Sequence, residues 1–455
     1  MNDPVLIARL QFALTAMFHI LWPVLTIGLS LFLVLTEGLY LKTKDRLYYR
    51  QTRFWSRLFI LNFAVGVVTG IPMEFQFGTN WSAFSRAGGD LFGHLLGFEA
   101  TMAFMLEAAF LTIMIWGWNK VPPRMHYFAT IMVAFGGTLS AFWIMSANAW
   151  MQTPQGGIFE KGHFVVHSSL KAIFSSNTPW SFGHMWLACL TITLFVIGGI
   201  SAWYLLKNRD SAFFLCSFKI ALTAAILVTP LQIFIGDGSG LEIGRTQPSK
   251  LAAIEAHWRT NPMGSPAHWN LLAWPDKEIQ GNRWALQIPY MLSILDTHSL
   301  TGQVKGLREF PREDQPPIWL PFYAFRLMVG LGIAFFLLML WSVWVWRRGG
   351  LSLERITSQK TLLKAWMAAV PLSYLAMEAG WATREVGRQP WIIYGILRTR
   401  EGVSPLPAWT MGGSLVVLGL LYLALLITFL LFARNIIRNG PGNDEDGSDP
   451  KGLER

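Results

Sequence analysis

Two histidines lie within apolar runs of the chain that are long enough to cross a membrane. His19 stands in TAMFHILWPVL, and His184 stands in WSFGHMWLACL. Polar groups are costly inside a bilayer, which makes both residues functional candidates. An isolated imidazole fits packing and metal ligation equally well. A haem–copper centre needs a cluster of imidazoles, and two or three histidines within membrane runs are too few for it. The absence of CxxCH excludes a covalent c-type haem. Paired with Met or a carboxylate, they could hold non-covalent haems.

Carboxylates in a further apolar run could carry protons. Glu99 and Glu107 stand in GFEATMAFMLEAAF, eight residues apart. On an α-helix this spacing is about 12 Å along the axis and roughly 80° around it. A proton relay needs protonatable groups separated by one or two waters, and Ser140 in the next run could extend such a path. The alternative is a pair of protonated carboxyls with a structural role.

A second acidic pair, Glu378 and Glu385, stands in YLAMEAGWATREVGRQPW. Seven residues apart on a helix, the two share a face to within about 20°. Trp381 lies between them, and Arg388 follows Glu385 by one turn. This face therefore combines carboxylates, an aromatic ring and a cation.

Met328 stands in PFYAFRLMVGLG, two residues after Arg326. A lone Met in an apolar run is nearly always a packing residue. The nearby glycines 330 and 332 thin the helix, and an arginine is costly to bury in a membrane. These neighbours favour a ligand role for Met328 without deciding it.

A polar segment contains GDGSGLEIGRTQPSKLAAIEAHW at 236–258. Residues 237–240, beginning with Asp237, predict a tight turn. Lys250 and Glu255 are expected on a short helix, where such a pair normally lies on a solvated face. No GxxxxGK[ST] phosphate loop is present. Six further histidines are expected in solvated loops: His126, His163, His167, His257, His268 and His298.

The composition indicates the elements that must position these residues. Of 455 residues, 53% are hydrophobic and 14% are charged, against about 25% charged in soluble domains. A soluble enzyme is therefore excluded. The net charge of +10 does not indicate nucleic acid, because the basic residues form short clusters between apolar runs. Nine runs are long enough for membrane helices, near residues 10–40, 56–77, 92–118, 126–149, 183–206, 214–236, 321–346, 364–386 and 410–433.

We expect an all-α integral membrane protein with about nine transmembrane helices. Residues 1–236 would form six helices, 237–320 an outer loop, 321–433 three helices and 434–455 a polar tail. Basic residues between alternate runs place those loops and the C-terminus in the cytoplasm, with the N-terminus outside. The loop after the eighth run breaks this rule with Arg384, Arg388, Arg398 and Arg400. Fixed anions such as haem propionates could hold these arginines.

Nearly the whole chain resembles the haem-bearing subunit I of cytochrome bd-type quinol oxidases, including the cyanide-insensitive kind with a short quinol loop. The motifs that carry this resemblance are GFEATMAFMLE at 97–107, SANAWMQTP at 146–154, GDGSG with KLAAIEAHW within 236–258, FRLMVGLG at 325–332, GWATREV at 380–386 and GRQPW at 387–391.

The resemblance implies two haems b and one haem d, with a third haem b as the alternative to haem d. His184 and Met328 would be the axial ligands of a low-spin haem b near the outer face. His19 and Glu385 would hold the two high-spin haems, in an order that stays open. Trp381 would lie among the haems, and Arg9, Arg326 and Arg388 would neutralise propionates or developing charge.

The resemblance also implies proton and quinol residues. Glu99 would lie beside the high-spin pair, with Glu107 and Ser140 leading to it from the cytoplasm. Lys250 and Glu255 would contact the quinol, and Asp237 would shape that site.

The implied activity is a terminal quinol:oxygen oxidoreductase of the bacterial cytoplasmic membrane. It would oxidise quinol outside and reduce O2 with cytoplasmic protons, generating a proton motive force without pumping. The implied partners are a second multi-spanning subunit and the lipid bilayer, with small single-span subunits left open and no nucleic acid. Ubiquinol and menaquinol also stay open. The alternatives are a haem b electron-transfer subunit and a proton-coupled transporter.

Overall fold

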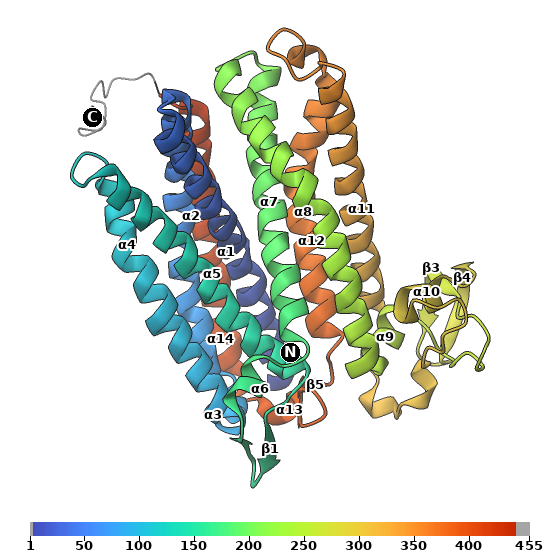
Figure 1. Cartoon of the computed structure of the whole chain (residues 1–455). Helices are drawn as coiled ribbons and strands as arrows, with labels where there is room; N and C mark the ends of the chain where they lie inside the picture. The colour runs from blue at the N-terminus through green and yellow to red at the C-terminus, as the bar shows by residue number, and fades with distance from the viewer. Residues whose placement is uncertain (1–2, 443–455) are drawn as a thin grey trace.

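The computed structural model describes residues 3–442, and they form a bundle of long helices (Figure 1). Eight helical segments in this range are long and apolar enough to cross a membrane. They are α1 (Pro4–Thr43), α2 (Arg46–Thr79), the continuous segment of α3 (Ser82–Phe98), η1 (Glu99–Phe104) and α4 (Met105–Trp116), α5 (Pro123–Gln152), α7 (Thr178–Leu206), α8 (Ser211–Thr246), α11 (Trp319–Arg347) and α14 (Ala408–Asn439). The predicted all-α membrane class is confirmed.

The ninth predicted run corresponds to α12 (Lys360–Val386), which packs between α7 and α11. This helix has 27 residues, slightly fewer than the eight other segments, and is still long enough to cross a membrane. Its charged residues, among them Glu378, Arg384 and Glu385, lower its mean hydropathy. Such groups at membrane depth are placed toward the interior of a bundle. The helix with the weakest membrane signal is therefore the one that carries most of the candidate chemistry.

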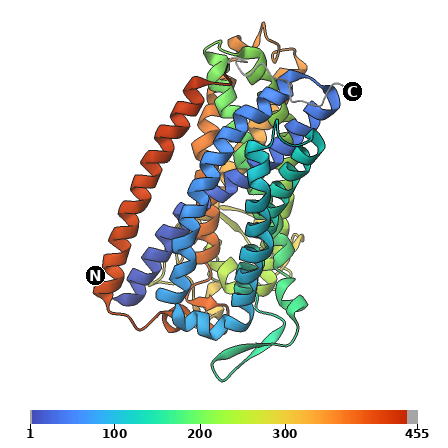
Figure 2. The same ribbon diagram turned by 90° about the vertical axis from the view of Figure 1, so that its left-hand side faces the viewer.

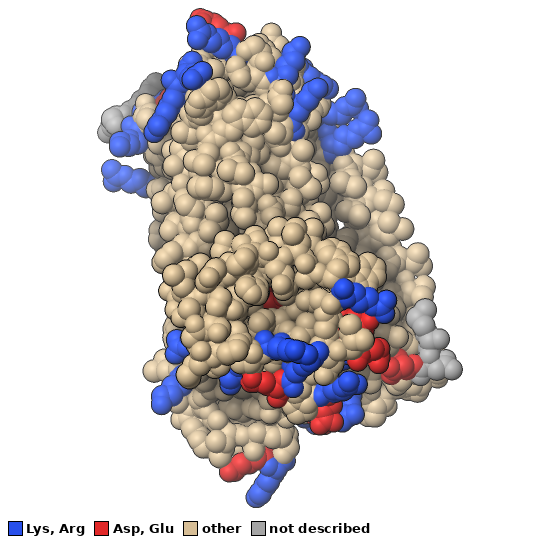
Figure 3. Space-filling view, turned by 90° about the vertical axis from the view of Figure 1, so that its right-hand side faces the viewer, with Lys and Arg blue, Asp and Glu red and all other residues tan. Residues whose placement is uncertain are grey.

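Short elements gather at the end of the bundle opposite the basic loops, which are the loops between alternate runs (Figures 1 and 2). They include the hairpin of β1 (Gly157–Glu160) and β2 (His163–Val166), α6 (Ser169–Ile173), α9 (Pro248–Ile254), the hairpin of β3 (Trp269–Asp276) and β4 (Gly281–Ile288), α10 (Met291–Thr297), η2 (Leu307–Glu309), η3 (Arg312–Asp314), β5 (Trp391–Ile393), β6 (Leu397–Arg398) and α13 (Thr399–Gly402). At the basic end, η4 (Ile356–Ser358) joins α11 to α12. Figure 3 shows charged side chains at both ends and a broad uncharged band between them, as a membrane-spanning bundle requires.

The tight turn predicted at residues 237–240 is wrong, because α8 continues as a helix to Thr246. Gly238 serves helix packing here. A Cβ at this position would lie 2.1 Å from the Trp180 ring on α7. Small residues let two membrane helices approach closely, and this contact outweighs the tendency of glycine to end a helix.

The expectation of a solvated loop is also wrong for His126, which is buried in the first turn of α5. Its Nδ1 lies 2.6 Å from Glu37 Oε1, and its Nε2 lies 3.1 Å from the Met114 carbonyl oxygen. The hydroxyl of Thr130 donates to the other Glu37 oxygen at 2.6 Å. His257 is half-buried, with Nε2 3.2 Å from the Val304 carbonyl oxygen. The other four are exposed, as expected: His163, His167, His268 and His298.

Candidate functional site

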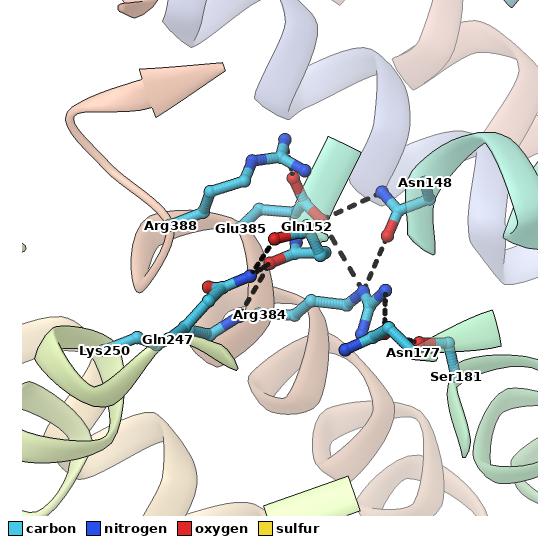
Figure 4. Close-up of polar contacts among 9 residues, drawn as sticks. All are labelled: Asn148, Gln152, Asn177, Ser181, Gln247, Lys250, Arg384, Glu385 and Arg388. Carbon is cyan, nitrogen blue, oxygen red and sulfur yellow. Dashed lines mark hydrogen bonds and ion pairs between the residues drawn. The ribbon is translucent and has the colours of Figure 1, made fainter. Parts of the chain in front are cut away.

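The carboxylate of Glu385, at the end of α12, is the centre of a polar cluster (Figure 4). Asn148 and Gln152, one turn apart on α5, donate to its Oε1 at 3.0 and 3.2 Å. Arg388, which follows α12, donates to Oε2 at 2.5 Å. The carboxylate is thus oriented from two directions by hydrogen-bond donors, one of which is a cation.

Arg384 extends this cluster toward α7. Its Nε donates to the Asn148 side-chain oxygen at 2.6 Å, and its Nη2 donates to Asn177 Oδ1 at 3.3 Å. Ser181 donates to the same Asn177 oxygen. The closest approach of Arg384 to Glu385 is 3.9 Å. Two of the arginines that break the positive-inside pattern therefore lie beside one carboxylate, inside the bundle.

Lys250 belongs to the same cluster, although sequence analysis expected it on a solvated face. Its side chain is 1% exposed, and its Nζ donates to Gln152 Oε1 at 3.0 Å. Gln247, one turn earlier, also donates to Gln152 Oε1 at 3.0 Å. Burial, and next the positive charge of Arg384, lower the pKa of Lys250 well below its usual value. The solvated-face expectation fails because Gln152, the last residue of α5, supplies a partner for the buried Lys250 nitrogen.

Glu255 is also buried, and it pairs with Arg326 of α11. Arg326 Nη2 lies 2.6 Å from Glu255 Oε2. The other nitrogens of this guanidinium donate to the Ile254 carbonyl at 3.2 Å and to the Asn270 carbonyl at 3.1 Å. Burial raises the pKa of Glu255, and Arg326 opposes this shift. The structure thus brings two predicted site residues together at the base of the outer segment.

Asp237 lies apart from these groups. It pairs with His298 in a half-exposed contact of 3.0 Å on the surface of α8. Arg9 lies in the second turn of α1 with an exposed side chain, and Trp381 packs against the main apolar core. These three residues are therefore not part of the buried cluster.

Each of the other three candidate ligands faces a glycine on a neighbouring helix. His19 Nδ1 lies 3.0 Å from the Thr69 hydroxyl, and a Cβ on Gly70 would lie 3.3 Å from its ring. A Cβ on Gly236 would lie 3.2 Å from the His184 ring, and one on Gly380 would lie 2.9 Å from the Met328 sulfur. Because glycine has no side chain, each candidate ligand packs directly against the backbone of a neighbouring helix.

Arg388 provides an indication of a bound group. Its Nε and Nη1 are buried and have no hydrogen-bond partner within residues 3–442. Nη2 pairs with Glu385, but buried donors that lack a hydrogen-bond partner still cost free energy. A carboxylate brought in by a flat prosthetic group would satisfy it, and a haem propionate is such a carboxylate. The residues present therefore fit haem.

Glu99 and Glu107 both face α5. Ser140 donates to Glu99 Oε1 at 2.6 Å, and Glu107 is buried, where a Cβ on Gly137 would lie 3.3 Å from its Oε1. Glu99 begins the π-helical turn η1. This wider turn changes the angular spacing expected for a regular α-helix, and such turns are frequent at functional sites. Both carboxylates and Ser140 thus share one helix interface.

Comparison with known proteins decides the family. The model of the family "Cytochrome bd terminal oxidase subunit I" matches residues 7–441. The chain belongs to this family. Family membership implies haem cofactors and a second subunit.

Curated relatives and a solved structure agree with this result. The chain is 36% identical to cytochrome bd ubiquinol oxidase subunit 1 of Bacillus subtilis, over 94% of the chain and 93% of the relative. It is 35% identical to cytochrome bd-II ubiquinol oxidase subunit 1 of Escherichia coli, over 97% and 98%. The bd oxidase structure from Geobacillus thermodenitrificans superposes with a TM-score of 0.88 at 32% identity, covering 97% of this chain and 100% of that one.

Several polar residues that bind the charged site residues were not among the sequence-based candidates. Asn148 and Gln152 are part of the motif SANAWMQTP, but no role was predicted for either. Their spacing of four residues places both on one helix face. Glu37 lies in the first apolar run, and as an acidic residue at membrane depth it should have been a candidate. The feature of the sequence that could have indicated these residues is the concentration of polar side chains at the ends of apolar runs.

Proposed function

We propose that this chain is the haem-bearing subunit of a terminal quinol oxidase. Quinol is oxidised at the end of the bundle that holds Lys250 and Glu255, and O2 is reduced to water where His19 and Glu385 lie. The observation that carries this proposal is the buried connection from Lys250 through Gln152 to Glu385. The names of the relatives, which are ubiquinol oxidases and a putative menaquinol oxidase, support quinol as the substrate class.

His184 and Met328 are proposed as the axial ligands of a low-spin haem b. His19 and Glu385 are proposed to hold two high-spin haems, one b and one d or both b. When bound, haem iron supplies one-electron transfer and, where a ligand position is open, oxygen binding. The glycines opposite the histidines and Met328 let these side chains lie against the neighbouring helices, where a larger residue would crowd the proposed ligands.

At the quinol site, Glu255 is the proposed proton acceptor. A carboxyl with a raised pKa takes a proton from a hydroxyl group more readily than an ordinary carboxylate does. Arg326 orients this carboxylate through the 2.6 Å contact. Lys250, whose pKa is lowered, is proposed to donate a hydrogen bond to a quinol oxygen, and Asp237 to border the site.

Near Glu385, the cations Arg384 and Arg388 offset the negative charge of carboxylates, and Asn148 and Gln152 fix the orientation of Glu385. Arg9 and Arg326 are proposed to act likewise toward propionates. Trp381, on the same helix, is proposed to lie among the haems. Arginine suits this role because its planar donors match carboxylates.

Glu107, Ser140 and Glu99 are proposed to carry protons inward from the cytoplasm. The contact between Ser140 and Glu99 supports the last step of this path. Protons released from quinol outside and protons consumed from inside together separate charge across the membrane. A proton motive force then arises without a pump.

The proposed location is the bacterial cytoplasmic membrane, with the N-terminus outside and the basic loops in the cytoplasm. A second multi-spanning subunit is the proposed partner, and small single-span subunits remain a further proposal. Along α14, only Met411, Tyr422 and Ala433 are buried. Most of this helix therefore faces lipid or another subunit.

A reduced-minus-oxidised absorbance spectrum of the purified complex, repeated with carbon monoxide, tests the proposal. We expect a low-spin b band, a red-shifted d band and high-spin bands that shift with carbon monoxide. Only b bands with that shift would replace haem d by a third haem b. A spectrum without any carbon monoxide response would contradict the oxidase and indicate an electron-transfer cytochrome. A colourless complex would indicate a transporter.

Two variants make this test specific for the low-spin ligands. His184→Ala and Met328→Leu are each expected to remove the low-spin b band. Met339→Leu is the matched control, because Met339 is a buried packing residue of the same helix. An unchanged low-spin band in the first two variants would sink the ligand assignment.

A further inference from the structure

The hairpin of β3 and β4 is apolar on the side that faces away from the protein. Leu272 and Leu286 are cross-strand partners, and Trp274 and Trp284 lie next along the same side. All four side chains are between 45% and 53% exposed. We call these four residues the outer hairpin face. Contiguous exposed apolar groups of this kind mark interaction surfaces, whereas single ones need no explanation.

The inward side of the same hairpin is already occupied: Ala273 and Ala285 pack in an apolar cluster, and two asparagines form hydrogen bonds. Asn270 donates from its side chain to the carbonyl oxygens of Glu255 and Ala256, both at 3.0 Å. Asn282 donates to the Ala256 carbonyl at 3.1 Å and accepts from the Trp258 indole at 2.8 Å. A strand cannot exchange its two faces without a shift of register. These bonds therefore hold the apolar side outward.

The outer hairpin face continues onto the membrane helix α11. Trp274 contacts Trp319 edge-on, with ring centroids 4.7 Å apart, and Tyr323 donates to the Ala273 carbonyl at 2.6 Å. Trp319 and Leu320, the first residues of α11, are themselves exposed. Further exposed apolar residues follow along α11, namely Leu327, Ile333, Leu337 and Leu340. Figure 1 shows the hairpin projecting sideways, beside the first turns of α11.

We propose that the outer hairpin face lies in the outer interface of the lipid bilayer, with phospholipid as its ligand. Tryptophan and leucine side chains suit this zone, where rings meet both acyl chains and head groups. The zone also fits the backbone. A two-stranded hairpin leaves edge groups unpaired, so it fits the wet interface and not the hydrocarbon core. The charged turn agrees, because Asp276 and Arg283 pair at 2.7 Å at the far end of the hairpin.

The depth of the outer hairpin face bears on quinol oxidation, and this consequence rests on the proposed function. Quinol with a long tail is dissolved in the bilayer, and its head group reaches the interface. The outer hairpin face holds the hairpin at that depth, and Asn270 on its other side binds the backbone of Glu255. The face therefore keeps the proposed proton acceptor level with the incoming quinol.

A nitroxide spin label on the hairpin, in the complex reconstituted into liposomes, tests the location. The label is attached to Leu286→Cys in a variant that also carries Cys216→Ser. Cys216 is replaced because it is partly exposed, whereas Cys189 is buried and can stay. Collisions with oxygen report lipid, and collisions with a water-soluble nickel chelate report water. We expect oxygen to dominate at position 286. Glu278→Cys, at the exposed turn, is the control in which the nickel chelate should dominate.

Two results would overturn the inference. Equal nickel access at 286 and 278 would place the face in water. A label that is immobile and inaccessible to both reagents would show that protein covers the face. Leu272→Cys repeats the measurement if the first variant does not assemble. Because collisions are measured without turnover, the result is independent of whether the complex oxidises quinol.

Discussion

The ammonium group of Lys250 donates a hydrogen bond of 3.0 Å to the side-chain oxygen of Gln152. The nitrogen of the same carboxamide lies 3.2 Å from Glu385. One neutral side chain on α5 thus joins the outer segment to the end of α12. All three groups are buried or half-buried. A substitution or a change of charge at Lys250 therefore alters the hydrogen bonding of Glu385 through Gln152.

We expect Gln152→Leu to slow quinol-dependent oxygen uptake by at least tenfold and to alter the high-spin haem bands, with the low-spin band kept. The substitution leaves a buried ammonium and a carboxylate each short of a hydrogen bond, at a cost of about 1–3 kcal/mol each. Oxygen uptake and absorbance spectra measure the two effects. Gln155→Leu is the control, since Gln155 forms only exposed contacts with Ser176. Normal uptake and spectra in Gln152→Leu would contradict the link.

The raised pKa of Glu255 predicts the pH dependence of quinol oxidation. The carboxylate form must accept the proton, so kcat/KM should fall as the pH is lowered through this pKa, which lies above the usual 4.5. Glu255→Gln should be slow and should lose this acidic limb. Glu309→Gln, on the exposed segment nearby, should keep the wild-type profile. An acidic limb retained in Glu255→Gln would assign the acceptor to another group.

Asp296 of α10 should make the complex less stable at high pH. Burial, and then the charge of Glu255, raise the pKa of Asp296 to about 6. The folded carboxyl therefore holds its proton more tightly than the unfolded one, and stability is lost as the pH rises from the unfolded pKa through about 6. Asp296→Asn should raise the unfolding temperature at pH above 7 and leave it unchanged below pH 4. Equal effects at both pH values would refute this explanation.

Glu107→Leu should slow oxygen reduction and leave the haem content intact. The variant removes a buried protonatable group from the interface with α5, so proton delivery, and not electron input, becomes limiting. Oxygen uptake and haem bands are measured on the same sample. Glu354→Leu, an exposed residue of a basic loop, serves as the control. Full turnover in Glu107→Leu would count against this route.

The membrane helices could be predicted because hydropathy is a property of consecutive residues. The runs at 183–206 and 321–346 correspond to α7 and α11 without any knowledge of their neighbours. The same local rule fails for Lys250, because the group that compensates its burial, Gln152, is 98 residues away in the chain.

His126 and Gly238 show the same limit. The local sequence predicts a loop at His126, since it does not show the distant partner Glu37, which lies on another helix. It predicts a turn at Gly238, since it does not show the Trp180 ring on another helix that requires a small residue there. Local patterns predict which residues are unusual. Tertiary contacts decide whether an unusual residue is solvated, packed or paired.

The π-helical turn at Glu99–Phe104 also constrains how this helix can change in evolution. Substitutions within the turn alter single side chains. A π-helical turn holds about one residue more than an α-helical turn, so deleting one residue within it would leave a regular α-helix. Glu107 and Glu99 would then both keep their place against α5. This stretch should therefore tolerate the loss of one residue better than the regular α-helices of the bundle, where a deletion turns every later position by about 100°.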